Sequence, residues 1–276
     1  MKNTIINALL IVSLCAHQAG AANPAVGIHI IEDVSGAELQ KHGIKAADFD
    51  DMQILADTLF ATRRAASIGY DVVDEDGQDN SPLQFSITPF EKTIPTRPAF
   101  KGMTVRDKML ALKEFEARSA EFRKDNDEWR ARILDGARSW LDDCVDHRLQ
   151  VEADFLARLK ANQNRDFRRS DIIGAVQKAN ECLAGASAKF LVLNSDLNHQ
   201  PGPGARDQKV RSLGIADLSA DIVLIIVNTS REPDKSPLLK DLPNRTLHAD
   251  NLQAAAALIA VELTAGSKSL PTKPSE

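Results

Sequence analysis

The sequence predicts an α/β protein with a doubly wound, mostly parallel β-sheet, an antiparallel hairpin at one edge of that sheet and a long helical insertion. Three observations lead to this fold class. Short apolar segments rich in β-branched residues alternate with segments whose apolar residues recur at helical spacing, as in parallel sheets covered by helices. The acidic, glycine-containing stretch 74–82 separates two strand candidates and favours a hairpin. The stretch 104–164 has no proline and a single glycine, which favours a long helical insertion.

The start of the chain has the composition of a cleavable secretory signal peptide. Lys2 precedes an apolar run over residues 5–16, and small residues occupy positions 19–22. The run is shorter than the roughly 20 residues that span a membrane, which disfavours the alternative of an uncleaved anchor. Cleavage at a lipidated Cys15 is a second alternative, which the bulky Leu14 disfavours. We therefore expect an exported protein, periplasmic or secreted, with no membrane insertion after cleavage.

Composition narrows the class of partner. Hydrophobic residues make up 43% of the chain and charged residues 26%, which is typical of a globular protein. The formal charge is -5, and removing Lys2 with the signal peptide makes it -6. A negative chain of this kind argues against binding to nucleic acid or to anionic membranes. We expect a protein partner that is neutral, basic or bridged by a metal ion.

The strand candidates are short, apolar and bounded by turn-forming residues. The segment 70–73 is the weakest of them, and it is expected to pair with 84–88 as the antiparallel edge hairpin. In chain order the candidates are 26–31, 70–73, 84–88, 190–193, 222–227 and 245–248.

Apolar residues at helical spacing predict helices over 47–66, 171–183 and 251–264. The stretch 104–164 is expected as one long helix or a helical hairpin. It holds both tryptophans, which makes it a candidate interaction surface, although such residues also pack an insertion onto its own domain. The chain is thus divided into a signal peptide (1–22), a first part of the α/β domain (23–103), the insertion (104–164), a second part (165–265) and a disordered tail (266–276).

Three side chains are expected in the core. Cys144 and Cys182 are in register with the apolar residues of predicted helices, so both are expected to be buried. In an exported protein they could form a disulfide, and two free thiols are the alternative. No histidines accompany them at the spacing of a zinc site. His29, inside the first strand, is expected to be a core residue with satisfied hydrogen bonds rather than a metal ligand.

Short oxygen-bearing side chains follow the strands that should lie at the centre of the sheet. The carboxyl ends of parallel strands meet at one edge, so these side chains should converge there. Oxygen ligands of this type suit Mg²⁺. They are Asp33 and Ser35 after the first strand, Ser170 before the helix at 171–183, and Ser195 and Asp196 after the strand at 190–193.

This order of motifs resembles the von Willebrand factor A (VWA) domain. In that family an Asp-x-Ser-x-Ser motif, a threonine and a later Ser/Thr-Asp pair form the metal-ion-dependent adhesion site. The first motif corresponds here to residues 33–37, with Ala37 in place of one ligand. The second motif begins at Ser170, where threonine is expected, and Ser195 with Asp196 resembles the third. The resemblance implies that Ser35 and Ser170 bind Mg²⁺ directly. Asp33 and Asp196 would act through water or as hydrogen-bond acceptors.

The resemblance implies a non-enzymatic domain that binds another protein, with Mg²⁺ completed by a carboxylate of that partner. Without an oxygen at Ala37, the site would hold Mg²⁺ with an additional water. The alternative is a degenerate site without metal, in which Ser170 only caps a helix. Two other functions stay open: a metal-assisted hydrolase that uses Asp33 and Asp196, and a structural component of an envelope assembly with a vestigial metal site.

Overall fold

The computed structural model describes residues 25–33, 65–73, 82–161, 171–195, 197, 218–227, 237–239 and 242–268. The expected signal peptide and most of the helix expected over 47–66 lie outside these residues. The tail expected over 266–276 lies outside them from 269 onward.

Within the described residues, six strands form one sheet in the order β3-β2-β1-β4-β5-β6. All neighbouring strands are parallel except β2 and β3, which pair antiparallel with Tyr70 opposite Leu83. A mostly parallel sheet with an antiparallel hairpin at one edge is therefore confirmed. The strands are β1 Val26–Asp33, β2 Ala66–Val73, β3 Leu83–Ile87, β4 Ala188–Asn194, β5 Ile222–Val227 and β6 Thr246–Ala249.

The central strand β1 is buried at every residue, which explains its nearly continuous apolar sequence. Successive side chains point to opposite faces, so Ile28 and Ile30 join one hydrophobic core and Ile31 joins the other. The strand β2 begins at Ala66, earlier than the predicted start at residue 70. The sequence did not predict this first half of the strand because Ser67 and Gly69 have low β-propensity. Parallel pairing of β2 with β1 along its whole length overrides this local preference.

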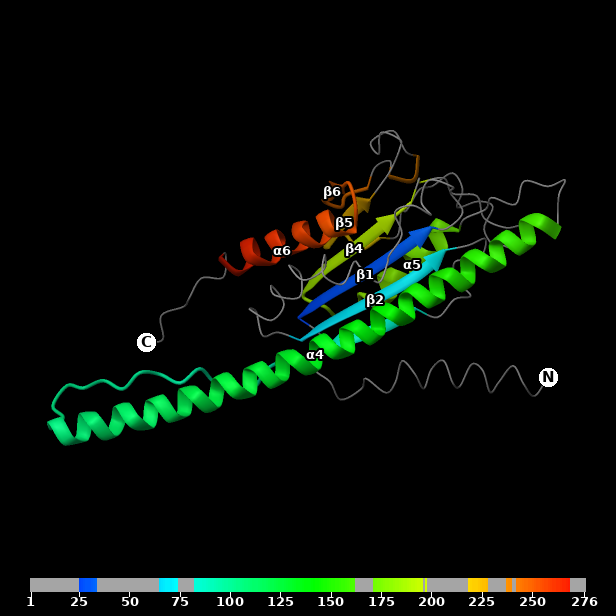
Figure 1. The fold of residues 1–276 in the computed structure, drawn as a ribbon. Helices are drawn as coiled ribbons and strands as arrows, with labels where there is room; N and C mark the ends of the chain where they lie inside the picture. Colours follow the sequence, from blue (N-terminus) through cyan, green and yellow to red (C-terminus); the bar gives the residue numbers. More distant parts are fainter. Residues whose placement is uncertain are drawn as a thin grey trace, which may run out of the picture.

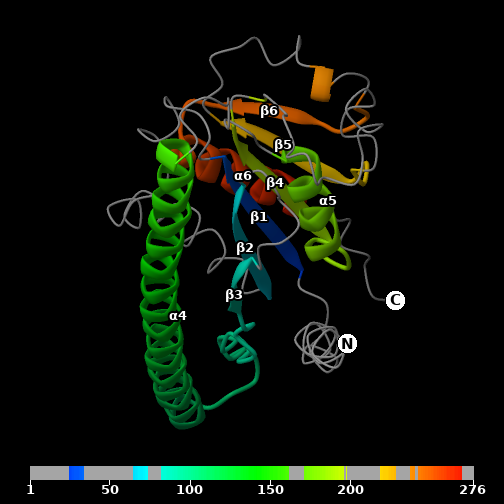
Figure 2. The same cartoon turned by 90° about the vertical axis from the view of Figure 1, so that its right-hand side faces the viewer.

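Helices cover both faces of the sheet (Figure 2). The helix α5, Ile172–Cys182, packs its apolar residues into the core that contains Ile31. The helices α4, Val105–Ala161, and α6, Leu252–Lys268, contribute to the core on the opposite face. A short 3₁₀ turn, η4, covers Pro237–Leu239. The helices expected over 171–183 and 251–264 are thus confirmed, and α6 continues into residues 266–268.

The insertion is one continuous helix rather than a helical hairpin. Its 57 residues make α4 about 85 Å long, and its amino-terminal part projects beyond the sheet (Figure 1). The segment after β3 runs outward along this projecting part to the start of α4 (Figure 1). There the ring of Phe90 lies 5.5 Å from that of Phe122 and 5.4 Å from that of Trp129, and the Trp129 Nε1–H donates to the Thr88 carbonyl at 3.1 Å. We refer to residues 88–130 as the arm.

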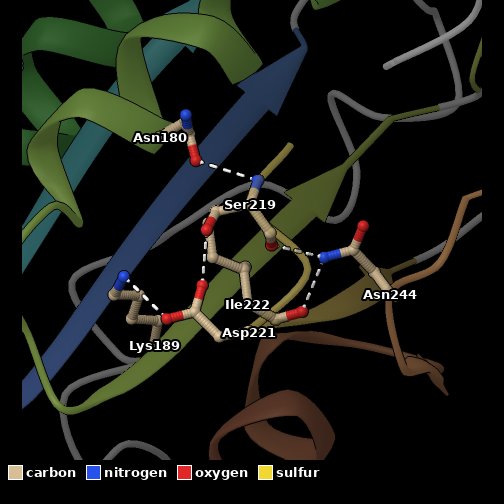
Figure 3. A network of polar contacts seen from close by, with 6 residues as sticks. All are labelled: Asn180, Lys189, Ser219, Asp221, Ile222 and Asn244. Atoms are coloured by element: carbon tan, nitrogen blue, oxygen red, sulfur yellow. Dashed lines mark hydrogen bonds and ion pairs between the residues drawn. The ribbon is translucent and has the colours of Figure 1, made fainter. Parts of the chain in front are cut away.

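A polar network joins the elements at the amino-terminal edge of β4 and β5 (Figure 3). Asp221 accepts a hydrogen bond from the Ser219 hydroxyl at 2.6 Å and forms an ion pair with Lys189 at 2.8 Å, and both contacts hold the pKa of Asp221 below its usual value. The Ser219 amide donates to Asn180 Oδ1 at 3.1 Å, and the Asn244 side chain donates to the Ser219 carbonyl at 2.8 Å. The network ties α5, β4, β5 and the chain before β6 together.

The two cysteines occupy different environments. Cys144 is a buried thiol of α4 that faces the sheet, and burial raises its pKa. Cys182 is exposed at the end of α5, where its Sγ accepts a hydrogen bond from Gln84 Nε2 at 3.7 Å, so the expectation that it is buried is wrong. The apolar stripe of α5 passes through Ala179 and Leu183 instead.

His29 is buried in β1, opposite Gly69 of β2. A Cβ atom on residue 69 would lie 2.4 Å from His29 Nδ1, so only glycine leaves room for the imidazole ring. Among the described residues, neither ring nitrogen has a hydrogen-bond partner, which contradicts the expected satisfied histidine. Burial, followed by the charge of Lys178, lowers the His29 pKa from 6.5 to about 3.

We predict that His29 makes the protein less stable as the pH falls. The folded state keeps His29 neutral, while the unfolded state binds the proton. The contribution of neutral His29 to the free energy of unfolding is therefore complete above pH 6.5 and declines toward pH 3. The free energy of unfolding then falls by up to about 1.4 kcal/mol per pH unit, which gives a loss of about 2 kcal/mol between pH 6.5 and 5. Urea unfolding at these pH values should show a smaller loss for His29→Leu. The exposed His248→Leu variant should retain the full loss, and identical pH profiles for all three proteins would contradict the prediction.

Candidate metal site at the carboxyl edge of the sheet

The strands β1, β2, β4 and β5 are parallel neighbours, so their carboxyl ends lie at one edge of the sheet. Ligands of open α/β sheets bind at this edge. Of the residues predicted for the metal site, Asp33 lies within the described part of the chain, at the end of β1. Ser35, Ser170 and Asp196 lie outside it.

Asp33 contacts the residue that follows β4. The Ser195 hydroxyl donates to Asp33 Oδ2 at 3.0 Å, and both side chains are buried. The Leu197 amide in turn donates to Ser195 Oγ at 3.0 Å. Leu197 has a positive φ of 61°, an uncommon conformation for leucine. The first and third motifs of the sequence therefore meet, although Asp33 and Ser195 are 162 positions apart.

Asp171 caps the helix α5 at the start of the second motif. Its Oδ1 accepts a hydrogen bond from the Gly174 amide at 3.0 Å. The alternative in which Ser170 is the N-cap is therefore wrong. The cap lies one residue later, because a carboxylate at 171 can accept from the amide three residues further on.

The described residues fit part of an oxygen-lined cation site. A buried carboxylate that accepts a serine hydroxyl is suited to hold a hydrated Mg²⁺ through water. Asp33 provides this arrangement at the strand end. Within the described ranges, no three His, Cys, Asp or Glu side chains form a metal-binding group.

A second polar cluster, on the face covered by α4, was not predicted from the sequence. Glu32 is buried and accepts hydrogen bonds from the Tyr70 hydroxyl at 2.6 Å and from Asn194 Nδ2 at 3.0 Å. Arg148 of α4 is also buried, and its Nε lies 3.5 Å from Glu32 Oε2. Burial, followed by the charge of Glu32, raises the Tyr70 pKa well above its usual value. A charged residue that ends an apolar strand was the available signal, but its partners come from distant segments.

A second buried ion pair lies on the face covered by α5. Lys178 Nζ is 2.8 Å from Oδ2 of Asp71, whose side chain is fully buried. Burial raises the pKa of Asp71, and Lys178 opposes that shift. Each face of the sheet is thus joined to a helix by a buried ion pair.

A cavity of about 560 Å³ lies away from the carboxyl edge, within the arm. It is open to solvent and is bounded by the segment after β3 and by α4. Polar residues of both segments, including Lys92, Arg118 and Asp125, line it. Lys92 already forms ion pairs with Glu121 and Asp125, so the charges of this cavity are largely balanced.

The protein is an α/β protein, and the strand order of its sheet is compatible with Rossmann-like and VWA-like folds, in which ligands bind at the carboxyl edge. Comparisons of the chain with protein-family models, curated proteins and solved structures find no match. No helix within the described ranges is long and apolar enough to cross a membrane.

We predict that Arg148→Met lowers the free energy of unfolding by about 3 kcal/mol, because it leaves Glu32 as a buried charge without its cationic partner. Urea denaturation at pH 7 measures the change. Adding Glu32→Gln to the variant removes the uncompensated charge and should restore part of the stability. The exposed Arg132→Met variant on the same helix is the control. Equal stability of the two single variants would contradict a structural role for the ion pair.

Proposed function

We propose that this protein is an exported, doubly wound VWA-like domain that binds another protein through Mg²⁺ at the carboxyl edge of its sheet. The observation that carries the proposal is the hydrogen bond between Ser195 and Asp33, which joins the first and third motifs at one point. The position of Asp171 at the start of α5, where the second motif begins, supports it as well.

In this proposal Ser35 and Ser170 bind the metal directly, and Asp33 and Asp196 hold its water ligands. Ala37 provides no oxygen, so an additional water completes the octahedral shell and affinity is lower than in a site with all ligands. A carboxylate of the partner then replaces one water. The metal ion would thus bridge two negatively charged groups, so a negatively charged chain could bind a protein carboxylate but would not attract a nucleic acid.

The export step places the domain in the periplasm or outside the cell. It depends on the signal-peptide pattern of residues 1–22. Pulse labelling in an export host, followed by N-terminal sequencing of the released chain, distinguishes cleavage near Ala22 from an uncleaved or lipidated form.

Calorimetric titration of Mg²⁺ into the purified chain tests the metal site. We predict millimolar or tighter binding, which Asp33→Ala weakens about ten-fold or more because the serine and water network loses its acceptor. The matched control is Asp221→Ala, which removes a carboxylate at the opposite edge of the sheet. An absence of heat at millimolar Mg²⁺, or equal binding by Asp33→Ala, would rule out the metal-dependent form of the proposal.

The partner is tested by capture from envelope extracts in Mg²⁺ and in a chelator. Capture that requires Mg²⁺ and is lost in Asp33→Ala supports the proposal. Capture that is unaffected by chelator favours instead a structural component with a vestigial site. Turnover of phosphoester or ester substrates that disappears in Asp33→Ala favours the hydrolase.

A further inference from the structure

The tip of the arm, residues 97–113, presents large apolar side chains to solvent. It contains the start of α4 and the chain that turns into it, at the end of α4 that projects furthest from the sheet (Figure 1). Large apolar side chains exposed close together are a common feature of interaction sites. These side chains are Met103 (38% exposed), Val105 (75%), Met109 (68%) and Leu110 (53%).

The same tip is strongly basic, in contrast to the whole chain. Residues 97–113 contain five basic side chains and one acidic side chain, so the local charge is 5 - 1 = +4. The acidic residue is Asp107, which accepts a hydrogen bond from the Thr104 hydroxyl at 2.7 Å while its amide donates to the same oxygen. The five basic side chains are exposed: Arg97, Lys101, Arg106, Lys108 and Lys113.

The local charge, rather than the charge of the whole chain, determines what the tip attracts. Val105 is about 36 Å along α4 from Trp129, where the arm meets the sheet. Charges are screened over about 8 Å at physiological ionic strength. The negative charge of the domain therefore has little effect at the tip, and the composition argument against anionic membranes does not apply there.

We propose that the tip of the arm docks peripherally on a lipid bilayer that carries anionic headgroups. Apolar side chains surrounded by Lys and Arg on a projecting end match the requirements of the membrane interface, where apolar groups enter the acyl boundary and cations contact phosphates. A tip of this size does not span the bilayer. The proposal stands independently of the proposed Mg²⁺ site.

Docking at the tip would leave the carboxyl edge accessible. The parallel strands point away from the tip (Figure 1), and α4 runs from the tip past Thr88, at the end of β3, to Arg148 beside Glu32. The candidate metal site and the bilayer would therefore lie at opposite ends of the protein. The long rigid helix would act as a spacer between a membrane and a partner.

Co-sedimentation of the exported chain with vesicles tests the proposal. We expect binding to vesicles of phosphatidylcholine with phosphatidylglycerol and little binding to phosphatidylcholine alone. Raising the salt from about 0.1 M to about 0.5 M should release the protein, since screening weakens its attraction to the surface. An absence of binding to the anionic vesicles, or equal binding to both kinds, overturns the proposal.

Two double variants separate the contributions of the tip. Lys101→Gln with Arg106→Gln should weaken binding about ten-fold or more, because each basic residue near an anionic surface contributes roughly five-fold. Val105→Asp with Met109→Asp should weaken it at least as much. The matched controls are Arg123→Gln with Arg132→Gln on the same helix, and Val261→Asp, an exposed apolar position of α6. The controls should bind as the unaltered chain does.

All the altered side chains are exposed, so the unfolding midpoint should be unchanged and loss of binding reports on the tip. Tip variants that bind like the controls overturn the proposal. Sedimentation velocity provides a further outcome. If the chain is a dimer that the Val105→Asp and Met109→Asp pair dissociates, while vesicle binding is absent, the tip is an interface between copies and the lipid proposal is wrong.

Discussion

The carboxylate of Glu32 imposes the strongest constraint on this fold. It lies at the end of a central strand that is buried at every residue, where an ion without a partner would destabilise the folded state by several kcal/mol. Tyr70 and Asn194, on the two neighbouring strands, donate hydrogen bonds to it. The compensating positive charge comes from Arg148, so α4 must lie across this end of the sheet.

Anchoring α4 at Arg148 determines where the rest of that helix extends. Trp129 is buried near the end of β3, and upstream of it the helix packs against the segment that follows β3. Phe90 and Phe122 hold that segment against the helix. The arm projects from the domain because α4 is longer than the sheet on which it packs. On the opposite face, the ion pair of Asp71 and Lys178 holds α5 in the same manner.

The two ends of the molecule differ chemically. Buried oxygen groups gather at the carboxyl edge, where Ser195 joins Asp33, because parallel strands bring their ends together. Basic and apolar side chains gather at the tip of the arm, beyond the amino-terminal edge. The proposed Mg²⁺ site and the proposed membrane contact therefore use surfaces that do not compete.

Much of the fold could be predicted because its signals are local. The apolar strands 26–31 and 222–227, the hairpin and the helix at 171–183 each depend on residues close in sequence. The candidate site was predicted less completely. Asp33 was identified from its place after a strand. The alternative without metal placed the N-cap at Ser170, whereas the cap is Asp171. Asp33 and Ser195 needed the parallel register to meet, and Ser35, Ser170 and Asp196 remain predictions.

The sequence by itself determined the alternation of strands and helices, the edge hairpin and the helical character of 104–164, since periodicity and turn chemistry act over a few residues. Only the tertiary structure decided that this insertion is one helix, that Glu32 pairs with Arg148 and that His29 is buried opposite Gly69. These features depend on contacts between distant segments. A periodic pattern indicates which face of a helix is apolar, but not which buried charge that helix must neutralise.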